Sequence, residues 1–171
     1  MQRPSNSNRR YAFLKALHKI KNKSSKDQNS FWSIASINGQ PFNKQRTVPP
    51  LSDKVWGGYS QHQNVLFLPW YRAYLLYFEN ALINAAPASE KPLVAVPYWD
   101  TTASETLAEG IPDLLMDHLV TIDDIGNTIL NPLLDYMLPE AIPPPESSTK
   151  YVRSKGYTTL RYPFCGLTGS V

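Results

Sequence analysis

Apolar residues recur at helical spacing near the start of the chain. Residues 11–22 form the first such stretch, and residues 30–37 form a second, shorter one in which Ser30 or Asn29 can serve as the N-cap. Both stretches predict helices, the first of them amphipathic with a solvated basic face. The apolar positions that define the first helix are Phe13, Leu14, Leu17 and Ile20.

A third helix is predicted over residues 70–85, which carry a broad apolar surface behind Pro69. Proline suits a first helical turn because its missing N–H would lack an intrahelical partner there in any case. The apolar run at residues 65–68 leads into this helix. Further along, residues 94–99 predict a short extended segment, and residues 112–120 predict a weak helix.

The remaining chain is rich in turn-forming residues, with 15 prolines and 8 glycines among 171 residues. Residues 40–55 read as a Pro-rich loop, and residues 138–148 as the most linker-like segment. We therefore expect one domain over residues 11–171, behind a disordered N-terminus at residues 1–10.

Charge is distributed unevenly along the chain. Residues 1–30 contain eight Lys and Arg against one acidic residue, although the net charge is only +3. A solvated helix face explains this segment, since no nucleic-acid motif and no apolar run of membrane-spanning length accompanies it. The N-terminus lacks a secretory apolar core, and the lone Cys165 permits no internal disulfide. The sequence thus predicts an intracellular, cytoplasmic protein with neither nucleic acid nor membrane as a partner.

Three segments carry recognisable motifs. Residues 57–83 read GGYSQHQNVLFLPWYRAYLLYFENALI and place His62 ahead of the predicted helix. Residues 37–42 read INGQPF, and residues 96–100 read VPYWD, whose aspartate is expected to hydrogen-bond nearby backbone. Taken in chain order, the segments resemble motifs of the fungal-type tyrosinases and polyphenol oxidases, which are type-3 copper proteins. Residues 157–166 (YTTLRYPFCG) resemble a segment that lies between the two copper-binding halves of that family.

The resemblance implies a helical bundle with two coppers, three histidines per copper, and oxidation of phenols to catechols and ortho-quinones. The first three ligand positions fall on Asn38, His62 and Tyr71, and a cysteine position of many relatives falls on Ser60. Only His62 keeps the imidazole that suits copper. An amide oxygen is a weak donor, and a phenol must lose its proton to ligate well. We therefore assign His62 as a retained copper position and expect no catalytic residue.

The fold class that follows is mainly α: a partial tyrosinase-like bundle with long Pro-rich loops, lacking the second copper-binding helix pair. Neither His18 nor His118 stands in an H-x-x-x-H pattern, and both are expected to be structural. The expected function is that of a truncated tyrosinase-family member, an oxidoreductase by kinship with little or no oxidase activity alone. Its implied cofactor is copper, and its implied small-molecule partners are phenols.

Two other functions stay open. The chain can be a non-catalytic interaction or regulatory protein, because the apolar helix over residues 70–85 would expose a face able to bind another protein or a second copy. It can also be a phenol-binding or mononuclear metal protein built on Asn38, His62 and Tyr71.

Overall fold

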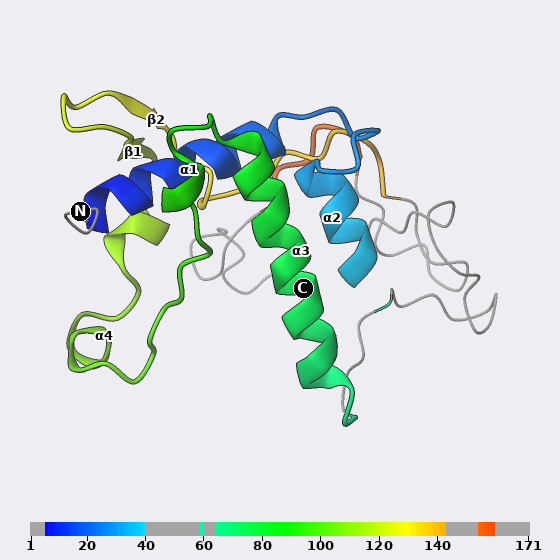
Figure 1. The fold of residues 1–171 in the computed structure, drawn as a ribbon, viewed down its shortest axis with the longest axis horizontal. Coiled ribbons are helices and arrows are strands. Elements are labelled where there is room, and N and C mark those ends of the chain that lie inside the picture. Colours follow the sequence, from blue (N-terminus) through cyan, green and yellow to red (C-terminus); the bar gives the residue numbers. More distant parts are fainter. Residues whose placement is uncertain (1–5, 40–58, 60–63, 143–153, 160–171) are drawn as a thin grey trace, which may run out of the picture. The chain divides into compact units, whose positions relative to one another are not determined.

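The computed structural model of the chain describes residues 6–39, 59, 64–142 and 154–159. Helices provide most of the regular structure within these ranges, which confirms the prediction of a mainly α fold (Figure 1). The elements in chain order are α1 (Asn6–Lys21), α2 (Phe31–Asn38), α3 (Phe67–Ala85), η2 (Lys91–Leu93), α4 (Ser104–Glu109), η3 (Asp113–Leu115), β1 (Leu119–Thr121) and β2 (Thr128–Leu130).

Internal contacts divide the chain into two units, and α1 and α3 each contribute residues to both. One unit comprises Met1–Lys19, Leu82–Tyr136 and Thr159–Val171, and the other comprises Ile20–Ala81 and Met137–Thr158. No helix among the described residues is long and apolar enough to cross a membrane.

Helix α1 buries the apolar face that its spacing predicts. It begins at Asn6, so residues 6–10 are helical rather than disordered, which corrects the expected N-terminal boundary. In the first unit, the Lys15 ammonium lies 2.5 Å from the Glu90 carboxylate, and Lys19 donates to the Ala85 carbonyl at 2.9 Å. The buried apolar residues of the helix are Ala12, Phe13, Leu14, Ala16, Leu17 and Ile20.

Helix α2 begins after the predicted N-cap. The Ser30 hydroxyl accepts a hydrogen bond from the Ser33 N–H at 3.1 Å, and this satisfies one of the backbone donors that a helix leaves unpaired at its start. At the other end the Gly39 N–H reaches the Ala35 carbonyl at 3.1 Å. Trp32 and Ile34 are buried, so this short helix is held by packing as well as by its cap.

Helix α3 starts at Phe67, three residues before the predicted start, and Pro69 falls in its first turn as expected. Its later residues Ala81, Leu82 and Ala85 are almost fully buried. Its earlier part is different, because apolar side chains remain exposed there: Leu68, Leu75 and Leu76.

The prediction of a helix over residues 112–120 is wrong. The structure has the 3₁₀ turn η3, followed by strand β1, which pairs antiparallel with β2 so that Val120 lies opposite Ile129. The buried Asn131 explains the difference, because its side-chain amide donates to the Leu114 and Asp117 carbonyls at 2.8 and 2.7 Å. In a continuous helix the Leu114 carbonyl would instead accept from the His118 N–H.

Candidate functional site

Two of the three predicted ligand positions lie together, within the unit that contains Ile20–Ala81. Asn38 is the last residue of α2, and Tyr71 lies in the second turn of α3. The Tyr71 hydroxyl donates a hydrogen bond to Asn38 Oδ1 at 2.9 Å, across 33 residues of sequence. The two side chains therefore contact each other directly.

Aromatic rings surround this hydrogen bond on the α3 side. Phe67 and Tyr71 are four residues apart, and their ring centroids lie 4.7 Å apart. Trp70 stacks on Tyr74 at 5.1 Å with an interplanar angle of 20°, and it meets the Tyr71 ring edge-on at 4.9 Å. A helical spacing of four residues brings Phe67 onto Tyr71 and Trp70 onto Tyr74, and the rings on either side limit how far the Tyr71 ring can turn.

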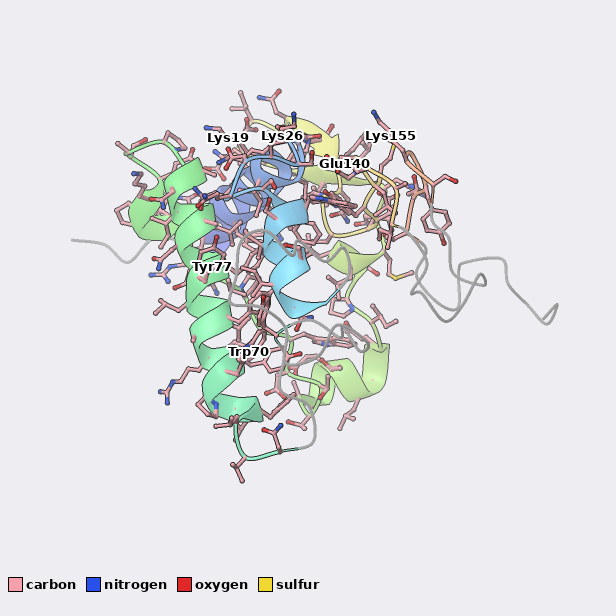
Figure 2. All side chains as sticks on the ribbon, turned by 90° about the vertical axis from the view of Figure 1, so that its right-hand side faces the viewer. Lys19, Lys26, Trp70, Tyr77, Glu140 and Lys155 are labelled. Carbon is pink, nitrogen blue, oxygen red and sulfur yellow. The ribbon has the colours of Figure 1, made fainter. Side chains whose placement is uncertain are left out.

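Two further tyrosines of α3 donate hydrogen bonds to backbone carbonyls in or just before α2. The Tyr74 hydroxyl donates to the Ile34 carbonyl at 3.1 Å, and the Tyr77 hydroxyl donates to the Gln28 carbonyl at 3.2 Å. Burial, reinforced by the nearby Tyr71 and Tyr77, raises the pKa of Tyr74 to about 12. Figure 2 shows Trp70 and Tyr77 on the side of α3 that faces α2.

The other candidate positions are only partly within the described residues. His62 and Ser60 lie outside the described residues, as does Cys165. His18 is half-buried on α1, and His118 is exposed ahead of β1. Within the ranges that the structure describes, no group of three or more His, Cys, Asp or Glu residues could hold a metal ion.

The VPYWD segment organises a turn. Asp100 Oδ1 accepts from the Thr102 N–H at 2.9 Å and from the Thr102 hydroxyl at 2.7 Å, and these hydrogen bonds lower the pKa of Asp100. The Trp99 indole N–H donates to the Thr106 hydroxyl at 3.1 Å, and that hydroxyl donates to the Asp100 carbonyl at 2.8 Å. The expected backbone-bonding role of Asp100 is therefore confirmed.

Comparison with known proteins identifies the family. The common central domain of tyrosinase matches residues 8–164. The chain belongs to the tyrosinase family. It is 38% identical over 150 residues to a tyrosinase from Hahella sp., covering 84% of this chain and 26% of the relative. It is 36% identical over 147 residues to a tyrosinase from Aspergillus oryzae, covering 83% of this chain and 24% of that relative.

Solved tyrosinases share the fold. A tyrosinase from Burkholderia thailandensis superposes with a TM-score of 0.73 at 34% identity, over 95% of this chain and 31% of that chain. A recombinant mushroom tyrosinase superposes with a TM-score of 0.64 at 31% identity, over 78% of this chain and 24% of that chain. The chain thus spans about a quarter to a third of the tyrosinases it matches.

Copper is the metal that the tyrosinase family implies, and the two described ligand positions do not fit it. The Asn38 amide oxygen already accepts the Tyr71 hydroxyl, so neither atom is directed to a shared metal. A phenol that donates this hydrogen bond carries its proton. Copper instead binds a deprotonated phenol or a neutral imidazole. Sequence reasoning found that both residues are poor ligands but missed that they bind each other.

Proposed function

We propose that this tyrosinase-family chain has little or no phenol or catechol oxidase activity of its own. The observation that carries the proposal is the 2.9 Å hydrogen bond from the Tyr71 hydroxyl to Asn38 Oδ1. This hydrogen bond occupies the polar atoms of two ligand positions, which would otherwise be available to a metal. With His62 as the one imidazole at the first copper position, the chain lacks the three-imidazole donor set of its family.

The histidine count supports the same proposal. The family holds each of its two coppers with three histidines, and this chain has three histidines in all. Two of them, His18 and His118, have no H-x-x-x-H spacing. The two-electron reaction of dioxygen with a catechol in this family uses both ions as a pair. We infer that residues 1–171 do not by themselves supply the ligands for that pair.

The test is copper titration of the purified chain, followed by catechol oxidation measured through quinone absorbance. We expect less than one tightly bound copper per chain and quinone formation no faster than with free copper at the same concentration. Stoichiometric binding of two coppers, or quinone formation at the rate of a complete tyrosinase, would contradict the proposal.

A paired substitution provides the control. Asn38→His with Tyr71→His restores imidazole at both positions, so affinity for one copper should rise. Catechol turnover should stay absent, because the second ion still has no ligands. If the paired variant oxidised catechol as rapidly as a complete tyrosinase, turnover would not require a second copper site.

A second candidate function is that of an interaction or regulatory protein, and the exposed side of α3 favours it. Leu68, Leu75 and Leu76 are 75%, 50% and 60% exposed, and their spacing puts them on one side of the helix. Exposed apolar residues gathered in this way are typical of surfaces that bind another chain. A chain that remained monomeric by light scattering at all concentrations, and bound no partner, would argue against this function.

A further inference from the structure

Three tyrosines at every third position of α3 direct their hydroxyls to the same neighbouring region. Tyr71, Tyr74 and Tyr77 donate to Asn38 Oδ1, the Ile34 carbonyl and the Gln28 carbonyl, at 2.9, 3.1 and 3.2 Å. The acceptors run backward along the sequence while the donors run forward, so α2 and α3 lie antiparallel (Figure 1). We name these three hydrogen bonds the tyrosine ladder.

We propose that the tyrosine ladder is a metal-independent clamp that joins α3 to α2 and, through Gln28, to the segment just before α2. Helices α2 and α3 carry two of the positions that correspond to copper ligands in the family. A metal ion bound by both helices would restrict their separation, and the Asn38–Tyr71 hydrogen bond does so directly at the same two positions. Asn38 and Tyr71 are poor copper ligands, and this structural role, which needs no copper, accounts for their identity.

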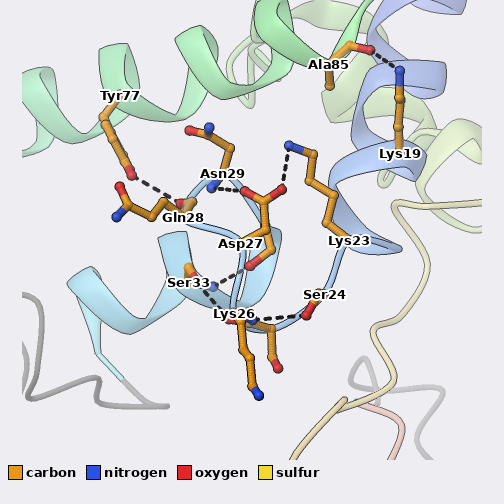
Figure 3. A network of polar contacts seen from close by, with 12 residues as sticks. Lys19, Lys23, Ser24, Lys26, Asp27, Gln28, Asn29, Ser33, Tyr77 and Ala85 are labelled. Atoms are coloured by element: carbon orange, nitrogen blue, oxygen red, sulfur yellow. Dashed lines mark hydrogen bonds and ion pairs between the residues drawn. The ribbon is translucent and has the colours of Figure 1, made fainter.

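The acceptor at the far end of the ladder is held by its own network (Figure 3). Asp27 next to Gln28 forms an ion pair with Lys23 at 3.2 Å, and its carboxylate accepts from the Asn29 N–H at 2.7 Å. The Ser33 hydroxyl ties α2 back to the Ser25 carbonyl at 2.9 Å. These contacts order the segment before α2, so less chain entropy is lost when the Gln28 carbonyl binds the Tyr77 hydroxyl.

The middle hydrogen bond is expected to contribute most. Tyr74 is half-buried and stacked on Trp70, so removing its hydroxyl takes from the Ile34 carbonyl a donor that water could replace only in part. The Tyr77 side is more open, since that residue is 37% exposed. The loss from removing a hydroxyl should therefore be largest at Tyr74 and smallest at Tyr77.

Thermal unfolding of the full chain tests the clamp. We expect Tyr71→Phe, Tyr74→Phe and Tyr77→Phe each to lower Tm, by up to about 2–4 °C for one hydrogen bond in a chain of this size. Tyr98→Phe is the matched control, because Tyr98 is 89% exposed, and its Tm should not change. Equal Tm values for the three ladder variants and the control would overturn the proposal.

The response to metal separates a clamp from a copper site. The Tm of the unaltered chain should be the same with copper sulfate and with EDTA, because the clamp needs no ion. A rise in Tm with copper that EDTA reverses would overturn metal independence. Detection of catechol turnover would instead contradict the proposed lack of activity and leave the Tyr74→Phe and Tyr77→Phe results unaffected.

A double-mutant cycle tests the first hydrogen bond alone. Asn38→Ala and Tyr71→Phe each break the same bond, so the double variant should lose less Tm than the sum of the single variants. Losses that simply add would show that Asn38 and Tyr71 act independently, which would remove this bond from the clamp.

Discussion

At the scale of single residues, the most consequential side chains are those whose partners are distant in sequence. Residue identity alone predicts that Asn38 and Tyr71 are poor copper ligands, since that follows from the chemistry of an amide and a phenol. Their hydrogen bond to each other was not predicted, because it joins positions 33 residues apart. Asn131 was missed for the same reason, as the carbonyls it binds lie 14 and 17 residues earlier.

The raised pKa of Tyr136 leads to a prediction about how stability depends on pH. Its N–H donates to the Thr159 hydroxyl at 2.9 Å, and its carbonyl accepts from the Thr159 N–H at 2.9 Å. Burial raises the pKa of Tyr136 to about 12, whereas an unfolded tyrosine titrates near about 10. Between these values the unfolded chain loses the phenol proton first, so the free energy of unfolding falls as pH rises. Below about pH 10, Tyr136 does not change how stability depends on pH.

Tyr136→Phe should therefore flatten the loss of stability between about pH 10 and about pH 12 relative to the unaltered chain. Urea unfolding midpoints measured across this range give the comparison, with the exposed Tyr98→Phe variant as control. Parallel pH profiles for the Tyr136→Phe variant and the unaltered chain would show that Tyr136 titrates alike in the folded and unfolded chain.

At the scale of elements, local signals predict helices well where the whole element follows one pattern. The Ser30 cap of α2, the first-turn Pro69 of α3 and the apolar face of α1 are local features, and each has the predicted role. Residues 112–120 show the limit of local pattern. Their apolar spacing suits a helix, yet pairing with β2 and the side chain of Asn131 hold them as a turn and a strand.

The ion pair between Lys15 of α1 and Glu90 ahead of η2 gives a prediction at this scale. Glu90 Oε1 lies 2.5 Å from the ammonium, and Glu90 Oε2 is buried with no hydrogen-bond partner among the residues that the structure describes. Lys15→Met would leave the whole carboxylate unpaired, so we expect a loss of about 1–3 kcal/mol in the free energy of unfolding. Adding Glu90→Gln should recover part of that loss, because the uncompensated charge disappears.

Chemical denaturation of the single and double variants measures this coupling. Lys23→Ala is the control, since its i,i+4 partner Asp27 has a side chain that is 39% exposed, against 24% for Glu90, and such a pair is expected to contribute only about 0.3–0.5 kcal/mol. If the Lys15→Met variant were no less stable than the Lys23→Ala variant, the Lys15–Glu90 pair would not make the larger contribution to the free energy of unfolding.

At the scale of the whole molecule, the order of motifs along the chain was enough to predict the family, which the match over residues 8–164 confirms. The 15 prolines and 8 glycines predicted many turns, whereas the helices were predicted from apolar spacing. The surface of α3 adds what the sequence pattern left ambiguous, because apolar spacing cannot separate a buried face from an exposed one. Leu82 of α3 is fully buried, whereas Leu68, Leu75 and Leu76 of the same helix are exposed.

This exposed face predicts the association state of the chain. We expect the purified chain to self-associate as its concentration rises, because covering Leu68, Leu75 and Leu76 removes apolar surface from water. Leu68→Glu with Leu75→Lys should restore a monomer without unfolding α3. The new glutamate lies four residues before Arg72 and near the helix start, and the new lysine lies four residues before Glu79, so both charges suit the helix.

Light scattering coupled to size exclusion measures the mass at each concentration. Leu107→Glu with Ile125→Lys is the matched control, because it makes the same charge changes at exposed positions of α4 and of the β1–β2 connection, which are 75% and 86% exposed. The control should associate like the unaltered chain, since its changes leave the α3 face intact. If both double variants became monomeric to the same degree, added surface charge would explain the change, and the α3 face would lose its assigned role in association.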